Sequence, residues 1–268
     1  MIIADLIKWF EAWANPAWQE KWDNCGWQIE PGVLNQSARV LVCLTPTLAV
    51  VEEAIALSTS GTEVNLIFAH HPLIFNPLKS LRTGDAITEI TRLAFSHQIG
   101  IYTAHTNFDQ VQEGTADILA TMLKLQEAMP IVPTQSNLGY GRVGKLNPTL
   151  TLAELLVQIQ TLLKPPNLII SPTADLAQII QKVAVLGGSG ASYISDVVKT
   201  GAQAYLTSDC KFHQFQESRD RGLILIDAGH YATERPACES LVTKFTALGL
   251  DWVKLSQNDE DFRCFFPT

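Results

Sequence analysis

The chain has 268 residues, of which 47% are hydrophobic and 17% are charged, with a formal net charge of -8. This composition is typical of a globular protein with a sizeable core and excludes a disordered chain. The charges are spread out apart from the short acidic run "NDED" at 258–261, and lysines and arginines form no stripe. A nucleic-acid-binding surface is therefore not expected.

The five cysteines are an odd number and show no CxxC spacing, which predicts reduced thiols in a cytosolic protein and neither a disulfide framework nor a zinc ribbon. Residues 1–14, "MIIADLIKWFEAWA", lack a basic start and predict an amphipathic helix instead of a signal peptide. No apolar run is long enough to cross a bilayer. We therefore expect a soluble protein of the cytoplasm without a membrane partner.

Short β-branched runs alternate with helical patterns along the chain. The predicted strands are "RVLVCLT" (39–45), "VNLIFAH" (64–70), "GIYTAHT" (100–106), "KVAVLGG" (182–188), "AYLTSD" (204–209) and "LILIDAG" (223–229). The predicted helices between them are 48–58, 85–97, 151–163 and 235–250. Near-continuous apolar strands followed by helices predict an α/β fold, with largely parallel or mixed sheets covered by helices.

The middle of the chain has a different composition. Between about residues 127 and 173 it is rich in Pro, Asn, Ser and Gly, which predicts an irregular crossing between two α/β units. We expect a first α/β domain over 1–128 and a second over 129–239. The segment from about 240 to 268 is a candidate to pack back on the first domain.

Five of the six histidines follow predicted strands: His70, His71, His105, His213 and His230. In open α/β sheets ligands bind beyond the carboxyl ends of the strands, where several loops converge. The sixth, His97, lies in a helical pattern and is interpreted as structural.

The pair His70–His71 ends a strand and is followed by Pro72. Neighbouring side chains of a strand point to opposite faces, but a turn at the proline could aim both imidazoles at one cavity. A single histidine in an apolar segment is more often a core residue than a metal ligand. The pair favours the metal interpretation.

Two further motifs add carboxylates. In "HTNFD" (105–109), Asp109 could bridge two cations, or it could be a turn residue. In "GHYATERP" (229–236), Thr233 is the predicted N-cap of a helix whose first turn contains Glu234 and Pro236. The alternative is that Glu234 only caps the helix.

Together these residues predict a metal site. Histidines with carboxylates suit Zn²⁺, Mn²⁺, Fe²⁺ or Ni²⁺ better than Ca²⁺ or Mg²⁺. Five protein ligands exceed what one tetrahedral ion needs, so two divalent transition-metal ions are expected. The predicted ligands are His70, His71, Asp109, His230 and Glu234.

Six stretches occur in the order found in one known family: "WDNCGWQI" (22–29), "HHPLIF" (70–75), "HTNFD" (105–109), "GGSG" (187–190), "GAQAYLTSD" (201–209) and "GHYATE" (229–234). The chain thus resembles the Nif-three-like family, whose members are often named GTP cyclohydrolase I type 2 homologues. The resemblance implies two α/β domains with a dinuclear metal site in the interdomain cleft, held by the same five ligands. It also implies a homo-oligomer, with ring-shaped hexamers built from dimers, and the compact form without an inserted domain.

The chain departs from the family pattern at several positions. Thr45 stands where the family often has Asp, and "TSD" (207–209) replaces TGD or TGE. The stretch "QVQEGTAD" (110–117) is also less glycine-rich than usual. These departures leave the five predicted ligands unchanged, but they affect any substrate preference inferred from other members.

The glycine-rich stretch "VAVLGGSGASY" (183–193) permits three interpretations. Gly188, Ser189 and Gly190 could offer backbone N–H groups to a phosphate, although Tyr193 stands where a dinucleotide fingerprint has its third glycine. A tight turn that packs a helix against a strand is the favoured alternative. The stretch also approximates a serine-hydrolase elbow, with Asp209 or Asp227 and His213 or His230 following in order.

The functional hypothesis is a metal-dependent hydrolase that acts on a phosphoester or a nucleotide-type C–N bond. His105 is the candidate acid/base residue, and His213 is a weaker one. The alternative is a non-enzymatic metal-handling, scaffold or regulatory protein. Trp22 and Trp27 could line a substrate pocket, but packing in the core or an interface is at least as good an explanation for them.

Overall fold

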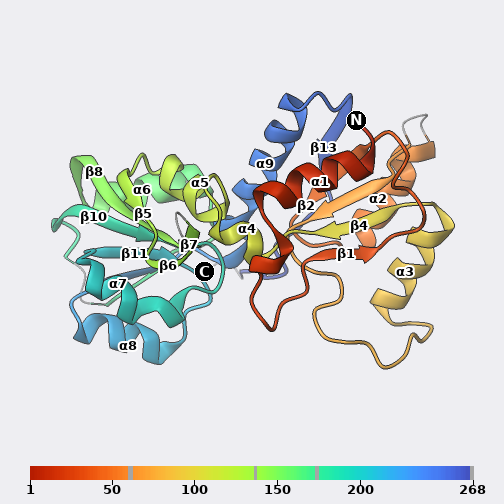
Figure 1. The fold of residues 1–268 in the computed structure, drawn as a ribbon. Coiled ribbons are helices and arrows are strands. Elements are labelled where there is room, and N and C mark those ends of the chain that lie inside the picture. The colour runs from red at the N-terminus through yellow and green to blue at the C-terminus, as the bar shows by residue number, and fades with distance from the viewer. Residues whose placement is uncertain (60–62, 136–137, 173–174, 266–268) are drawn as a thin grey trace. The chain divides into compact units, whose positions relative to one another are not determined.

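The structure is a computed structural model that describes residues 1–59, 63–135, 138–172 and 175–265 (Figure 1). The chain forms two compact units, each with its own sheet. The first unit is Met1–Phe108 with Cys238–Glu260, and the second is Asp109–Ala237 with Asp261–Thr268. Within the described ranges, no helix is long and apolar enough to cross a membrane.

The first unit is built on a five-stranded sheet in the order β1 (Gly26–Ile29), β4 (Gly100–Thr103), β3 (Leu66–Ala69), β2 (Arg39–Cys43) and β13 (Trp252–Leu255). All neighbouring strands are parallel except β1, which runs antiparallel to β4. The alternation of side chains sends Leu41 and Ile67 to one face, where helices α2 (Leu48–Thr59) and α3 (Ala86–Ser96) complete a core.

The other face of this sheet is covered by helix α1 (Ile3–Trp13) and by the end of helix α9 (His230–Ala247). Phe68 of β3 packs edge-on against Phe10 of α1 and Phe245 of α9, with ring centroids 4.8 and 5.0 Å apart. The predicted amphipathic N-terminal helix is confirmed, and its buried residues are Ile3, Leu6, Ile7 and Phe10. A short 3₁₀ helix, η1 (Pro16–Trp18), follows it.

The second unit is built on a six-stranded sheet in the order β5 (Gln126–Met129), β8 (Arg142–Thr151), β10 (Ile179–Val185), β11 (Ala204–Thr207), β12 (Ile224–Asp227) and β9 (Ile169–Ile170). Only the pairs β10–β11 and β11–β12 are parallel. Core residues of helices α5 (Thr115–Met122) and α6 (Leu152–Leu163) pack on one face. Those of η2 (Ala191–Tyr193), α7 (Ile194–Thr200) and α8 (Phe212–Asp220) pack on the other. The predicted α/β class with mixed sheets is confirmed.

The division between the units falls at 108/109, within helix α4 (Thr106–Gln110), whereas the sequence places it at 128. Helix α5 accounts for the difference, because Leu119 and Leu123 are buried in the same core as Leu155 of the second unit. Near the C-terminus, β13 pairs in parallel with β2, so Cys238–Glu260 belongs to the first unit, whereas the chain from Asp261 onward belongs to the second.

The middle of the chain is more regular than its composition predicts. It contains β5, β8 and a two-stranded antiparallel sheet of β6 (Val132–Gln135) and β7 (Leu138–Tyr140). Pro148 lies within β8, beyond the residues that pair with β5, where only one neighbouring strand needs hydrogen bonds. Pro133 and Pro148 therefore lie within strands and not in an irregular crossing.

Helix α9 begins at His230, one turn before the predicted start. Gly229 has a φ of +84°, and its carbonyl accepts hydrogen bonds from both the backbone N–H (3.2 Å) and the hydroxyl (3.0 Å) of Thr233. Thr233 thus lies inside the first turn and is not the N-cap, and Pro236 is inside the helix. The N-cap prediction was wrong because the glycine lets the chain become helical immediately after β12.

Candidate metal centre

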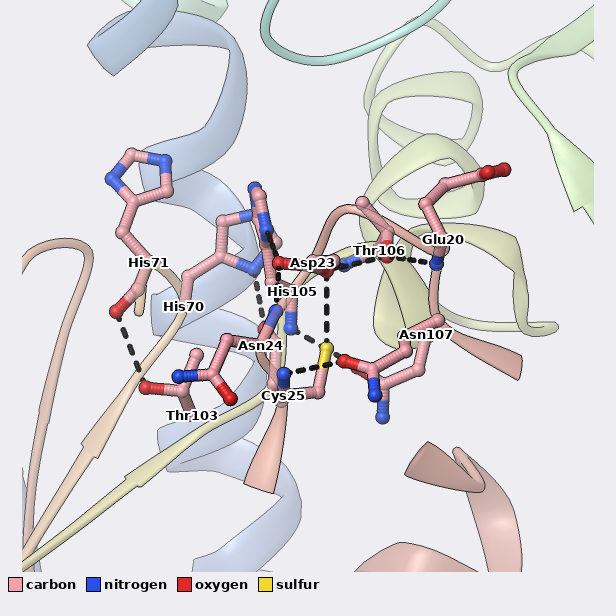
Figure 2. A network of polar contacts seen from close by, with 12 residues as sticks. Glu20, Asp23, Asn24, Cys25, His70, His71, Thr103, His105, Thr106 and Asn107 are labelled. Atoms are coloured by element: carbon pink, nitrogen blue, oxygen red, sulfur yellow. Dashed lines mark hydrogen bonds and ion pairs between the residues drawn. The ribbon is translucent and has the colours of Figure 1, made fainter. Parts of the chain in front are cut away.

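Three histidines of the first unit gather where two neighbouring parallel strands end. His70 and His71 follow β3, and His105 follows β4. One nitrogen from each ring lies within 4.8 Å of the others, and His70 is fully buried (Figure 2). These side chains therefore lie together at the carboxyl ends of two neighbouring strands, the place where open α/β sheets bind ligands.

The partners of two of these rings determine which nitrogen carries the proton. His70 Nδ1 lies 2.7 Å from the carbonyl oxygen of Ala104, and His105 Nδ1 lies 2.8 Å from Oδ1 of Asp23. A carbonyl and a carboxylate only accept, so Nδ1 donates in both cases and the lone pair of the neutral ring is on Nε2. Metal-binding histidines typically show this arrangement, with Nδ1–H held by an oxygen.

The third ring is oriented by a hydroxyl. Thr45 Oγ1 lies 2.8 Å from His71 Nδ1. Thr45 itself is held just after β2, where the carboxylate of Asp259 accepts hydrogen bonds from the backbone N–H groups of Thr45 (3.3 Å) and Leu44 (2.6 Å). The position that appears in the sequence only as a departure from the family pattern is thus the hydrogen-bond partner of a predicted ligand.

Asp23 contacts this histidine cluster but is not among the site residues predicted from the sequence. Its carboxylate accepts from His105 Nδ1, from the backbone N–H (3.1 Å) and hydroxyl (2.5 Å) of Thr106, and from Cys25 Sγ (3.2 Å), as Figure 2 shows. Burial by itself raises the pKa of Asp23. This effect is outweighed by the hydrogen bond and charge of His105 and by the hydrogen bonds from Thr106 and Cys25, so the pKa of Asp23 is well below its ordinary value. The ionised carboxylate fixes the His105 ring. The only sequence signal for it was the "WDN" motif.

In the second unit, His230 lies between two carboxylates. Its Nδ1 is 2.6 Å from Asp209 Oδ2, and its Nε2 is 2.8 Å from Glu234 Oε2. Burial lowers the pKa of His230, but the charge of Glu234 and the hydrogen bonds to both carboxylates raise it to about 10. The hydrogen bond from His230 in turn lowers the pKa of Asp209. Because both ring nitrogens face acceptors, the ring is an imidazolium.

Glu234 is packed against the glycine-rich loop. Gly188 has a φ of +66°, and a Cβ at this position would overlap Glu234 Oε1. The backbone N–H of Gly188 donates to Thr233 Oγ1 and that of Gly190 donates to Thr207 Oγ1, both at 3.0 Å. These contacts fit the tight-turn interpretation, because they join the loop to helix α9 and strand β11. Phosphate binding at this loop stays a prediction.

The serine-hydrolase interpretation does not fit the geometry. Ser189 Oγ donates to Asp209 Oδ2 at 2.5 Å, so a carboxylate and not a histidine accepts the hydroxyl proton. Asp227 accepts the backbone N–H groups of Cys210 (2.8 Å) and Gly229 (2.9 Å), a role that shapes the loops. His213 is exposed on helix α8.

The remaining predicted ligand, Asp109, lies in helix α4, and its Oδ1 accepts from the hydroxyl of Thr115 at 2.6 Å. The donor chemistry of both units fits divalent transition metals. The first unit supplies imidazole nitrogens with fixed tautomers, and the second supplies an imidazole with carboxylates. A proton lies between His230 Nε2 and Glu234. A metal ion bound at this place would supply the positive charge in its stead.

Comparisons with known proteins agree with this architecture. The profile of the Duf34/NIF3 (NGG1p interacting factor 3) family matches residues 1–260. A Nostoc sp. protein named "GTP cyclohydrolase 1 type 2 homolog" is 73% identical over 99% of both chains. A Streptococcus pneumoniae protein of the same name is 32% identical over 86% of this chain and 85% of its own. The crystal structure of a Bacillus cereus protein related to NIF3 shares the fold, with a TM-score of 0.88 and 24% identity over 99% of each chain. The chain therefore belongs to the Duf34/NIF3 family.

Proposed function

We propose that this chain binds two divalent transition-metal ions and is a hydrolase for a phosphoester or nucleotide-type substrate. The proposed ligands are His70, His71, Asp109, His230 and Glu234. The observation that carries the proposal is the histidine cluster of the first unit, in which every Nδ1 has an oxygen partner. The names of the relatives support a nucleotide-type substrate.

His105 is the proposed acid/base residue. Its Nδ1–H is held by the ionised Asp23, and its side chain is 15% exposed, so a substrate can reach the ring while its orientation stays fixed. A bound divalent ion acts as a Lewis acid and can lower the pKa of a water from 15.7 towards ~7. Nε2 of His105 would accept a proton from the attacking water and return it to the leaving group.

In the second unit, metal binding would displace the proton that lies between His230 and Glu234. His230 would hold a metal ion through Nε2 after losing the proton there, and Asp209 would keep the ring oriented through Nδ1. Glu234, no longer paired with an imidazolium, would offer its carboxylate as a ligand. Ser189, exposed on the glycine-rich loop, is a proposed contact for a phosphate of the substrate, together with Gly188 and Gly190.

Elemental analysis of the purified protein tests the metal proposal. We expect close to two equivalents of a transition metal in the wild type, and loss of metal from a His70→Ala/His71→Ala variant that circular dichroism shows to be folded. His213→Ala is the matched control, because this histidine is exposed on α8, and it should keep its metal. Absence of metal from the wild type, even after reconstitution, would sink the proposal.

Catalysis is tested separately on metal-loaded protein. We expect hydrolysis of phosphoesters or nucleotides by the wild type and a large loss in His105→Ala with the metal content unchanged. Metal that exchanges freely with a chelator, without any hydrolysis, would instead favour the metal-handling alternative. We also propose a cytoplasmic homo-oligomer, and light scattering after size-exclusion chromatography would test for the hexamer.

A further inference from the structure

Two exposed aromatic side chains lie together in the first unit. Trp22 is 58% exposed and Phe75 is 48% exposed, and their ring centroids are 5.8 Å apart at an interplanar angle of 51°. Trp27, from the same sequence motif, packs edge-on against the buried Tyr102 with centroids 5.4 Å apart. The structure thus separates the two tryptophans. Trp27 is half-buried against Tyr102, whereas Trp22 presents its ring to solvent.

The segments that carry this pair are fixed by polar contacts. Asn24 Nδ2 donates to the carbonyl of Ile74 at 2.7 Å, and the backbone N–H of Ile74 donates to Gln28 Oε1 at 3.0 Å. Asp23, next to Trp22, is held by His105 and by two hydrogen bonds from Thr106. The two segments that carry the rings are therefore fixed before any ligand arrives, which reduces the entropy lost on binding.

The aromatic pair adjoins the histidine cluster. The ring centroid of Trp22 is 6.1 Å from that of His105, which in turn is 5.3 Å from that of His70. A flat molecule that stacked on Trp22 would have its edge next to the proposed acid/base residue. Indole and phenyl faces favour stacking with planar heteroaromatic rings, because every such ring offers a π-face.

We propose that Trp22 and Phe75 bind a planar heteroaromatic ring of the substrate, of the nucleobase type, beside His105. This inference rests on the proposed function, and it names the part of the substrate that the first unit recognises. The exposed pair is apolar and aromatic, so it distinguishes a nucleotide from a sugar phosphate that lacks an aromatic base.

The test compares two probes on the metal-loaded full chain by titration calorimetry: GMP, and ribose 5-phosphate, which lacks the base. We expect GMP to bind more tightly to the wild type. Trp22→Ala should lower the affinity for GMP by about 5- to 150-fold, the range that corresponds to the stacking of one base on an aromatic side chain. The affinity for ribose 5-phosphate should not change. Trp22→Phe should keep most of the affinity, because it keeps a stacking face.

Phe95→Ala is the matched control, because Phe95 is 51% exposed on α3 of the same unit, and it should bind GMP like the wild type. Equal binding of the two probes by the wild type, or no GMP binding at all, would overturn the inference. Equal losses for both probes in folded Trp22→Ala would also overturn it. A Trp22→Ala variant that binds GMP normally but changes its oligomeric state would also overturn the inference, because the pair would then contact a second copy of the chain.

Metal content measured on the same samples separates this inference from the proposed function. Metal-containing protein without a difference between the probes would refute only the ring-binding inference. Protein that never holds metal would refute the proposed function. In that case the comparison of probes is made on the metal-free protein, because the aromatic pair and its polar contacts lie within the first unit.

Discussion

In the metal-free protein, we predict that His230 keeps its proton far above neutral pH. Burial lowers its pKa, but Glu234 and Asp209 outweigh this and raise it to about 10. With such a pKa, the protonated ring outnumbers the neutral ring by about 300 to 1 at pH 7.5. A metal ion that uses Nε2 must displace this proton, so metal uptake near neutral pH releases it.

The sign of the pH dependence follows from the raised pKa. The ion pairs of His230 contribute stability to the metal-free protein in full below the unfolded pKa of 6.5. This contribution is lost as the pH rises through about 10. For metal binding the trend is the reverse, because the proton competes with the metal. Displacement of this one proton makes the apparent affinity rise by about tenfold per pH unit below the pKa.

An NMR titration of the imidazole nitrogens in chelator-treated protein measures the pKa of His230 directly. Asp209→Asn and Glu234→Gln should each lower it, because each removes one negative charge next to the ring. Asp196→Asn is the control, since Asp196 forms a surface ion pair with Lys199 on α7. A wild-type pKa at or below 6.5, or equal shifts in all three variants, would refute the reasoning.

Three further predictions concern other parts of the chain. Thr45→Val removes the hydrogen-bond partner of His71 Nδ1 and should weaken metal binding by about 10- to 100-fold in a chelator competition, whereas Thr45→Ser should not. Burial and the charge of Asp23 raise the pKa of the Cys25 thiol to about 12. Mass spectrometry should therefore find Cys25 unmodified by iodoacetamide at pH 8, while the exposed Cys264 reacts. Equal labelling of the two cysteines would contradict this. Leu155 is fully buried in α6, so Leu155→Ala should lower the free energy of unfolding in urea by about 2–5 kcal/mol without changing the metal content. An unchanged unfolding curve would contradict the place of Leu155 in the core.

Hydrophobic periodicity, a local property of the chain, predicted strands β2, β3, β4, β10, β11 and β12 and helices α1, α2, α3 and α6, but it missed β1, β8, β13 and helix α5, among others. It also placed His70, His71 and His105 at the ends of strands, since these residues directly follow apolar runs. Local rules failed at helix α9. There a positive-φ glycine and the contact of Thr233 with Gly188 decide where the helix begins, and the rule that favours proline in the first turn does not.

Only the tertiary structure decided how these side chains are held. Asp23 reaches His105 across 82 residues of sequence, and Thr45 reaches His71 across 26. No periodic pattern encodes such pairs, because they depend on which loops the parallel strands bring to the same edge of the sheet. The same holds for the two tryptophans of one motif. Their exposure differs because Trp27 lies in strand β1 against a buried tyrosine, whereas Trp22 lies in the turn that precedes it.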